Sequence, residues 1–206
     1  MLMKITGLII SYLVGSIPTA YIFGRIIKNI DIRKCGSGNV GATNAFRVLG
    51  KPIGIIVLLI DIFKGFIAVL ILPQIFLPGN TTYKILIFAL AFCGHNWTVF
   101  LRFKGGKGMA VSLGGLAGLA VTINDIRLAL GLALLIWLII FLIFKYVSLA
   151  SIISATAFPI LLWYFKAPRE LLITGLVLAV LIILKHKSNI LRLLRNEELA
   201  IKIFKH

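Results

Sequence analysis

Apolar residues in this chain are grouped in long blocks and do not follow the period of an amphipathic helix or strand. A helix needs roughly 20 apolar residues to cross a hydrocarbon core of about 30 Å, and somewhat fewer where the span is short or partly buried. Seven blocks meet or approach this length, at residues 4–24, 53–72, 84–101, 109–123, 128–144, 147–165 and 171–184. The pattern predicts an all-α integral membrane protein with about seven transmembrane helices, of which 109–123 and 171–184 are the shortest.

The composition supports this class and argues against a separate soluble domain. Hydrophobic residues make up 60% of the chain and charged residues 14%, with a mean hydropathy of +1.07, whereas soluble domains carry about 25% charged residues. The first block is not expected to be a cleaved signal peptide, because it continues through Pro18 and Tyr21 without a small-x-small cleavage site. The longest polar stretch, 25–52, is too short for a core of its own. We therefore expect a single polytopic membrane domain over residues 1–206.

The positive charge is distributed unevenly, and this asymmetry predicts the orientation. The net charge is +16, from 22 Lys and Arg against 6 Asp and Glu. With seven alternating spans, sixteen of the basic residues fall on one side and five on the other, and Lys64 lies within a span. Cytoplasmic loops are enriched in Lys and Arg, so we expect the N-terminus outside and the C-terminus in the cytoplasm. Charge beside membrane spans is explained by anionic lipid headgroups, so no nucleic acid partner is expected.

The polar segment 25–52 contains a run rich in glycine and neutral hydrogen-bond donors, at residues 36–50. Glycines let the backbone turn several N–H groups toward one point, as in anion-binding nests. A short helix is expected over 40–49, with its N-terminus facing the same ligand. The alternative is a solvated loop, which would not need so many donors. The candidate residues are Ser37, Gly38, Asn39, Thr43, Asn44 and Arg47, of which Arg47 carries a planar guanidinium suited to phosphate.

A second glycine-rich run lies between two spans, within the segment 94–114. Its glycines permit close approach of main-chain N–H groups to phosphate oxygens, and its lysines add charge. No Ser or Thr follows Lys107 and no strand is expected before it, so this is not a nucleotide-binding P-loop. A basic turn that anchors the topology is the alternative. The candidate residues are Lys104, Gly105, Gly106, Lys107 and Gly108.

The third polar segment, 185–198, directly follows the last span. His186 and Asn189 are three residues apart, so they share one face if the helix runs on. The apolar residues beyond them predict an amphipathic helix on the membrane surface. A His at a membrane boundary is often only a polar boundary residue, and this alternative stays open.

Two charged residues, Asp61 and Lys64, lie within the span at 53–72. Charges inside the membrane are costly and usually paired, and the three-residue spacing allows an ion pair on one helix face. We expect a structural pair, with a direct role in substrate binding as the alternative. The few carboxylates offer no cluster for Mg²⁺, and His95 and His186 lack a third zinc ligand, so no metal or other cofactor is expected.

In this order and at these membrane positions, the three segments closely resemble the bacterial acyl-phosphate:glycerol-3-phosphate acyltransferase family. The resemblance covers the whole chain and is most specific in the strings Gly-Ser-Gly-Asn-x-Gly-Ala-Thr-Asn and Phe-Lys-Gly-Gly-Lys-Gly. The resemblance implies that Ser37 and Arg47 are needed for activity, and that His186 and Asn189 belong to the site. It also implies that glycerol 3-phosphate is bound with the help of Gly105, Gly106 and Gly108.

The family also has a structurally important Glu in the third segment. Here Asn196-Glu197 replaces the residues that usually precede it, which makes Glu198 the best match and leaves Glu197 as the alternative. The His-x4-Asp dyad of soluble and monotopic glycerolipid acyltransferases is missing, because neither His95 nor His186 has an Asp five positions on.

The implied reaction transfers a fatty acyl group from acyl phosphate to the 1-hydroxyl of glycerol 3-phosphate, giving lysophosphatidate and phosphate. This would be the first acylation step of phospholipid biosynthesis, at the cytoplasmic side of the bacterial inner membrane. Either His186 or the phosphate of the substrate would remove the hydroxyl proton. The expected partners are glycerol 3-phosphate, fatty acyl phosphate and membrane lipid, with no obligate protein partner. The rival interpretation is an organophosphate or anion transporter. A transporter would be expected to have polar residues in mid-span and broken helices.

Overall fold

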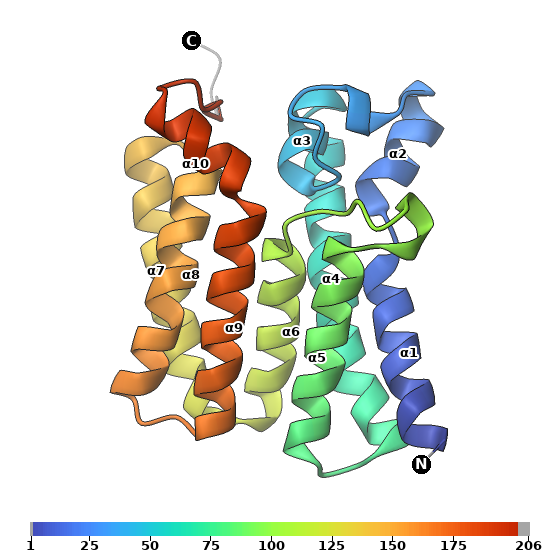
Figure 1. The fold of residues 1–206 in the computed structure, drawn as a ribbon, viewed down its shortest axis with the longest axis vertical. Helices are drawn as coiled ribbons and strands as arrows, with labels where there is room; N and C mark the ends of the chain where they lie inside the picture. The colour runs from blue at the N-terminus through green and yellow to red at the C-terminus, as the bar shows by residue number, and fades with distance from the viewer. Residues whose placement is uncertain (1, 202–206) are drawn as a thin grey trace. The chain divides into compact units, whose positions relative to one another are not determined.

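A computed structural model describes residues 2–201, and every regular element in that range is a helix (Figure 1). Each of the seven predicted apolar blocks is helical over most of its length, so the predicted all-α class is confirmed. The chain divides into two compact units, the first ending at Thr122 and the second beginning at Ile123. The single membrane domain expected over 1–206 stays a prediction.

The elements of the first unit, in chain order, are α1 (Leu2–Ser16), α2 (Thr19–Lys28), η1 (Ile32–Lys34), α3 (Ala42–Val48), α4 (Lys51–Phe76), α5 (Thr81–Asn96), η2 (Val99–Leu101) and α6 (Met109–Thr122). Those of the second unit are η3 (Asn124–Ile126), α7 (Arg127–Phe144), α8 (Val147–Tyr164), α9 (Arg169–Lys185) and α10 (Lys187–Leu194). The short helix predicted over 40–49 is α3.

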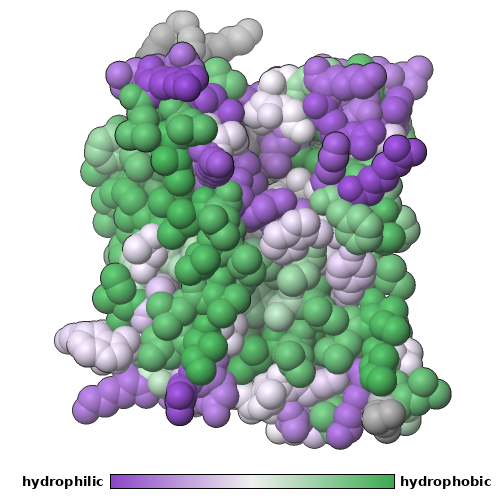
Figure 2. Space-filling model, in the orientation of Figure 1, coloured by the Kyte–Doolittle hydropathy of each residue, from purple (hydrophilic) through white to green (hydrophobic). Residues whose placement is uncertain are grey.

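Four helical stretches of the described chain are long and apolar enough to cross a membrane, at 51–76, 81–101, 124–144 and 147–164. The number rises to six if the bent pairs α1–α2 and α9–α10 each count as one span. The remaining block, α6, is apolar but has only 14 residues. Figure 2 shows hydrophobic side chains along the helices and hydrophilic ones gathered near the helix ends.

The first apolar block is not one straight helix, because it breaks between Ser16 and Thr19 and bends by 40°. Pro18 has no N–H to donate, and its ring disfavours a helical conformation for Ile17. A break inside a membrane must satisfy its carbonyl groups within the protein. Thr98 Oγ1 donates to the carbonyl of Ser16 at 2.6 Å, and Lys64 Nζ donates to that of Ile17 at 2.8 Å.

Glycines allow α6 to pack closely against α4. A Cβ at Gly114 would collide with the carbonyl oxygen of Ile62, and a Cβ at Gly65 would collide with that of Val111. Small residues at helix interfaces permit such close backbone contact in membranes. This packing fixes the N-terminal end of α6, where the second glycine-rich run ends.

In the second unit, α7 and α8 are joined by side-chain hydrogen bonds. Trp137 Nε1 donates to Ser151 Oγ at 3.2 Å, and Ser154 Oγ donates to the Ala133 carbonyl at 2.8 Å. The last apolar block does not run on into the third polar segment, because α9 and α10 are bent by 59° at His186. This corrects the continuous helix that the sequence allowed.

Candidate active site

The first loop, defined as residues 35–43, is anchored to the first unit by apolar side chains that flank it. Ile32, Val40, Ala45 and Leu49 are buried in one cluster with side chains from α2, α4 and η2, which are Ala20, Val57 and Leu101. A Cβ at Gly54 of α4 would collide with the Phe46 backbone, so α3 lies tightly against α4. The loop is therefore supported by a packed core.

Asn44 organises the interior of the first loop. Its side chain is fully buried, and its Oδ1 accepts a hydrogen bond from the Ser37 N–H at 2.9 Å. Its Nδ2 lies within hydrogen-bond distance of three carbonyl oxygens, those of Cys35 and Asn39 at 3.0 Å and Ile32 at 3.3 Å. The sequence predicted Asn44 as a ligand-binding residue. Its occupied, buried amide instead favours a role in holding the loop.

Other donors of the first loop point to a ligand site. Within the described chain, the main-chain N–H groups of residues 39–43 make no hydrogen bond to protein atoms. The same holds for the side chains of Ser37, Asn39 and Thr43, all partly exposed. Helix N-terminal N–H groups need partners from side chains, water or ligands. Donors gathered over so few residues suit a phosphate group.

Basic residues around the first loop differ in their surroundings. Asp31 pairs with Arg33 at 2.7 Å and lies 3.8 Å from Arg25, and the hydrogen bond from Arg33 lowers the pKa of the Asp31 carboxyl to about 2. Lys28 Nζ donates to the Val48 carbonyl at 2.7 Å, at the C-terminal end of α3. Arg47, in the last turn of α3, is half-buried. Its predicted role in gripping phosphate stays a prediction.

In the second loop, defined as residues 102–108, two glycine N–H groups are bonded within the protein. The Gly105 N–H donates to the Asn96 carbonyl at 3.2 Å, and the Gly106 N–H donates to the His95 carbonyl at 2.9 Å. These N–H groups hold the loop against the end of α5, and the predicted role of Gly105 and Gly106 in binding phosphate stays a prediction. A Cβ at either position would collide with His95. These two glycines are therefore required for close packing.

The remaining residues of the second loop lead into α6. Gly108 has a φ of +82°, and a Cβ there would collide with Phe92. Lys104 is exposed and Lys107 is half-buried. In Figure 1 this loop lies at the same end of the first unit as α2 and α3.

A buried polar cluster lies between α2, α4 and α5. Lys64 Nζ is 2.8 Å from Asp61 Oδ1, which is the ion pair expected from their spacing, and both side chains are buried. Thr19 Oγ1 donates to the same carboxylate oxygen at 2.9 Å, and His95 Nδ1 lies 3.9 Å from it. From the sequence, His95 was considered as a metal ligand and as part of a His-x4-Asp dyad, but not as a neighbour of Asp61. An intramembrane Asp and a polar residue at the end of the next span were the signals that could have linked them.

In the second unit, His186 lies at the break between α9 and α10 and is buried. Its Nδ1 is 2.8 Å from the Ile182 carbonyl oxygen. A carbonyl can only accept, so Nδ1 carries the proton in the neutral ring and Nε2 is the basic nitrogen. No acidic residue is needed to orient this imidazole.

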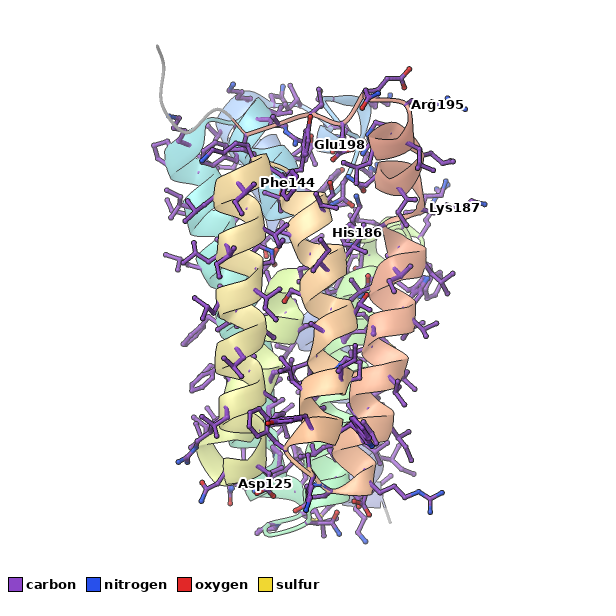
Figure 3. The ribbon with its side chains drawn as sticks, turned by 90° about the vertical axis from the view of Figure 1, so that its left-hand side faces the viewer. Asp125, Phe144, His186, Lys187, Arg195 and Glu198 are labelled. Carbon is purple, nitrogen blue, oxygen red and sulfur yellow. The ribbon has the colours of Figure 1, made fainter. Side chains whose placement is uncertain are left out.

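Glu198 ties the third segment together. Its Oε1 accepts hydrogen bonds from Asn189 Nδ2 at 2.7 Å and Ser148 Oγ at 2.9 Å, and its Oε2 accepts one from Arg192 at 2.8 Å. Burial acts to raise the pKa of this carboxyl, but these three hydrogen bonds together lower it below its ordinary value. Glu197, the alternative, is exposed. Figure 3 shows His186 and Glu198 at the same end of this unit as Phe144, with Asp125 at the other end.

Metal ligands are not grouped in the part of the chain that the structure describes. Among residues 2–201, no three His, Cys, Asp or Glu side chains are arranged to hold a metal ion.

Comparison with known proteins places these features in a family. Residues 5–196 match the family described as glycerol-3-phosphate acyltransferase. The chain is 43% identical over 196 residues to "Glycerol-3-phosphate acyltransferase 2" of Moorella thermoacetica, covering 95% of this chain and 96% of that protein. It is 45% identical over 190 residues to a glycerol-3-phosphate acyltransferase of Thermoanaerobacter sp., covering 92% and 91%.

Two solved structures are similar over nearly the whole chain. Both are crystal structures of PlsY (YgiH), an integral membrane glycerol 3-phosphate acyltransferase. Its glycerol 3-phosphate form has a TM-score of 0.87 at 36% identity, and covers 97% of this chain and 96% of that one. Its lysophosphatidic acid form has a TM-score of 0.83 at 35% identity, and covers 97% and 95%. On this evidence, the chain belongs to the glycerol-3-phosphate acyltransferase family and is an integral membrane enzyme.

Proposed function

We propose that this acyltransferase takes a fatty acyl group from an acyl phosphate and transfers it to the 1-hydroxyl of glycerol 3-phosphate. The observation that carries the proposal is the set of donors in the first loop. The N–H groups of residues 39–43 and the side chains of Ser37, Asn39 and Thr43 have no hydrogen-bond partner within the described chain. Both substrates of this reaction present a phosphate group, and one of them leaves as phosphate. The transporter alternative is not favoured by the family to which the chain belongs.

The reaction balances without a cofactor. The glycerol hydroxyl oxygen forms a bond to the acyl carbonyl carbon, the bond from that carbon to the phosphate oxygen breaks, and the electron pair leaves with phosphate. The hydroxyl proton passes to a base. Because the donor is a mixed anhydride, the protein has to hold two phosphate groups and keep the hydroxyl against the carbonyl, which is catalysis by proximity.

The roles proposed for the residues follow from their chemistry. Arg47 would bind a substrate phosphate through two parallel N–H groups, and Lys104 and Lys107 would add positive charge. Ser37 or Asn189 would donate to the carbonyl oxygen as negative charge develops on it. Gly38, Asn39 and Thr43 would belong to the phosphate site of the first loop.

The base is proposed to be the phosphate of the substrate, with His186 as the second candidate. Nδ1 of His186 faces the Ile182 carbonyl, so a proton would have to be taken up at Nε2. The second pKa of a phosphate ester lies near ~6, close to that of an unperturbed His at about 6.5. In the pH profile of kcat, the acidic limb should persist in His186→Ala if phosphate is the base. Loss of that limb would assign the base to His186.

We propose seven spans, with the site on the cytoplasmic side of the bacterial inner membrane and the N-terminus outside. In the first unit, the end that carries α3 and the second loop also carries most of the basic residues, which are Arg25, Lys28, Arg33, Lys34, Arg47, Lys51, Arg102, Lys104 and Lys107. Lys4 and Lys84 belong to the opposite end. The positive-inside rule then supports a cytoplasmic location for this end. The short α6 would be the seventh span, shielded by α4.

The test is turnover by detergent-purified protein of palmitoyl phosphate with glycerol 3-phosphate. We expect equal amounts of phosphate and lysophosphatidate, with no need for Mg²⁺ and no inhibition by EDTA. Palmitoyl-CoA in place of palmitoyl phosphate is the matched control and should give no product. Product from palmitoyl-CoA alone would overturn the choice of donor. Uptake of glycerol 3-phosphate into proteoliposomes without turnover would support the transporter alternative.

A further inference from the structure

The polar cluster buried in the first unit has a feature that pairing of charges alone does not explain. Asp61 and Lys64 are 1% and 6% exposed, and each has a further partner in or directly beside the break between α1 and α2. Asp61 accepts from Thr19 Oγ1, and Lys64 donates to the Ile17 carbonyl. These contacts satisfy the pair within the protein. Asp61 Oδ1 accepts the hydrogen bond from Thr19 and forms the ion pair with Lys64. The same atom also lies 3.9 Å from His95 Nδ1.

His95 lies in the last turn of α5 and is 8% exposed. One edge of its ring, Nδ1, is directed to Asp61, and the opposite edge, Nε2, packs directly against Gly106 of the second loop. A Cβ at Gly106 would collide with Nε2. The backbone of His95 contacts the same residue, because its carbonyl accepts the Gly106 N–H at 2.9 Å. His95 therefore holds Gly106 with both its ring and its main chain.

We propose that His95 is a positioning residue for the second loop, and that the buried carboxylate of Asp61 holds its ring in place. The ring lies directly against Gly106, and the main chain of His95 and Asn96 lies against Gly105. The position of the ring therefore sets where Lys104 and the N-terminal end of α6 meet a substrate phosphate. Only this last step, the contact with a substrate phosphate, rests on the proposed function. The contact between His95 and Gly106 can be tested without substrate.

The first experiment is a double-mutant cycle between His95 and Gly106, read as the KM for glycerol 3-phosphate and as kcat. Gly106→Ala adds a methyl group where Nε2 lies, and His95→Ala removes the ring. Each should raise KM, with a smaller effect on kcat. In the double variant the methyl group occupies part of the space of the ring. Since neighbouring residues couple strongly, we expect its KM increase to be at least about fivefold smaller than the product of the two single increases.

A matched control is Gly131→Ala. A Cβ at Gly131 in α7 meets no atom within 4 Å, so this variant adds a methyl group to a glycine without a steric consequence, and KM and kcat should stay at the wild-type values. Single increases at His95 and Gly106 that multiply within about twofold in the double variant would overturn the proposal, because independent sites are additive.

A second measurement separates this proposal from the function of the loop. Hydrogen exchange in the segment 103–109, without substrate, reports whether the Gly105 and Gly106 N–H groups stay bonded. We expect exchange there to be faster than wild type in His95→Ala. In His95→Gln it should be slower than in His95→Ala, because the amide keeps a polar group near Asp61. Unchanged exchange in His95→Ala would overturn the positioning role. Faster exchange with an unchanged KM would retain that role and remove the second loop from glycerol 3-phosphate binding.

The contribution of Asp61 is tested with both charges removed, because Asp61→Asn alone leaves Lys64 buried without its counter-ion. The variant Asp61→Asn with Lys64→Met should fold, because it leaves neither charge buried without its counter-ion and keeps an acceptor for Thr19 Oγ1. We expect faster exchange in the segment 103–109 and a raised KM. Wild-type exchange in this segment would exclude Asp61 from the mechanism and leave His95 to act alone.

Discussion

The two glycine-rich loops of the first unit look alike in sequence but use their backbones in different ways. In the first loop, the N–H groups of residues 39–43 have no partner within the described chain, and a buried Asn44 holds the loop from inside. In the second loop, the N–H groups of Gly105 and Gly106 are bonded to the end of α5. Glycine therefore serves close packing in the second loop, whereas we propose that it serves ligand access in the first.

The largest effect expected from this comparison is at Arg47. Arg47→Lys should lower kcat/KM by roughly 10- to 100-fold, because hydrogen bonds to a charged partner are worth about 1.5–3 kcal/mol and a point charge does not reproduce the planar fork. The melting temperature should change little. Lys104→Arg in the second loop is the matched control and should cost less than Arg47→Lys. Near-normal activity of Arg47→Lys would mean that Arg47 contributes only positive charge to the orientation in the membrane and does not bind phosphate through its planar group.

Thr43 of the first loop and its neighbour Asn44 should separate binding of a ligand from support of the loop. Asn44→Ala removes the hydrogen bonds that organise the loop and should lower the free energy of unfolding by about 2–4 kcal/mol. Thr43→Val keeps the shape and removes one hydroxyl, so it should lower activity by about tenfold at an unchanged melting temperature. Thermal unfolding and kcat/KM of both variants test this difference. Equal loss of stability in the two variants would contradict it.

For the second loop, Gly105→Ala should act through packing. Its Cβ would meet the carbonyl of His95 and the backbone of Asn96, so the loop must shift. We expect the KM for glycerol 3-phosphate to rise by about tenfold, with a smaller fall in kcat, since the loss is mainly of ground-state binding. Steady-state kinetics at saturating acyl phosphate measure both values. A lower kcat with an unchanged KM would instead assign this loop to the acyl phosphate or to the transition state.

The smallest effect concerns Glu198, which organises the third segment as Asn44 organises the first loop. Its pKa is lowered in the folded protein, so its contribution to stability is present above its ordinary pKa of 4.5 and is lost as the pH falls through the lowered value. Glu198→Gln should therefore have a lower melting temperature than wild type at pH 7. The difference should shrink below about pH 4. Glu197→Gln is the matched control, and a constant difference between Glu198→Gln and wild type across this range would contradict the assignment.

Much of the fold was predictable because it depends on local patterns. The seven apolar blocks are helical over most of their length, and α3 forms where a short helix was expected. Asp61 and Lys64 form the ion pair that their spacing implies. The breaks were harder to predict. Pro18 signals the first, but the bend at His186 has no proline or glycine beside it.

The sequence by itself determined the membrane class and the family, and it predicted the segments that we propose to carry the site, because these follow from hydrophobicity, charge and short motifs. Only the tertiary structure decided which donors of those segments are occupied. The amide of Asn44 is used within its loop, the Gly106 N–H is used by His95, and Glu198, rather than Glu197, binds Ser148, 50 residues away in the chain. A hydrogen bond depends on two atoms meeting at a defined distance and angle. Residue type and spacing describe only one of the two atoms, and the fold brings the other.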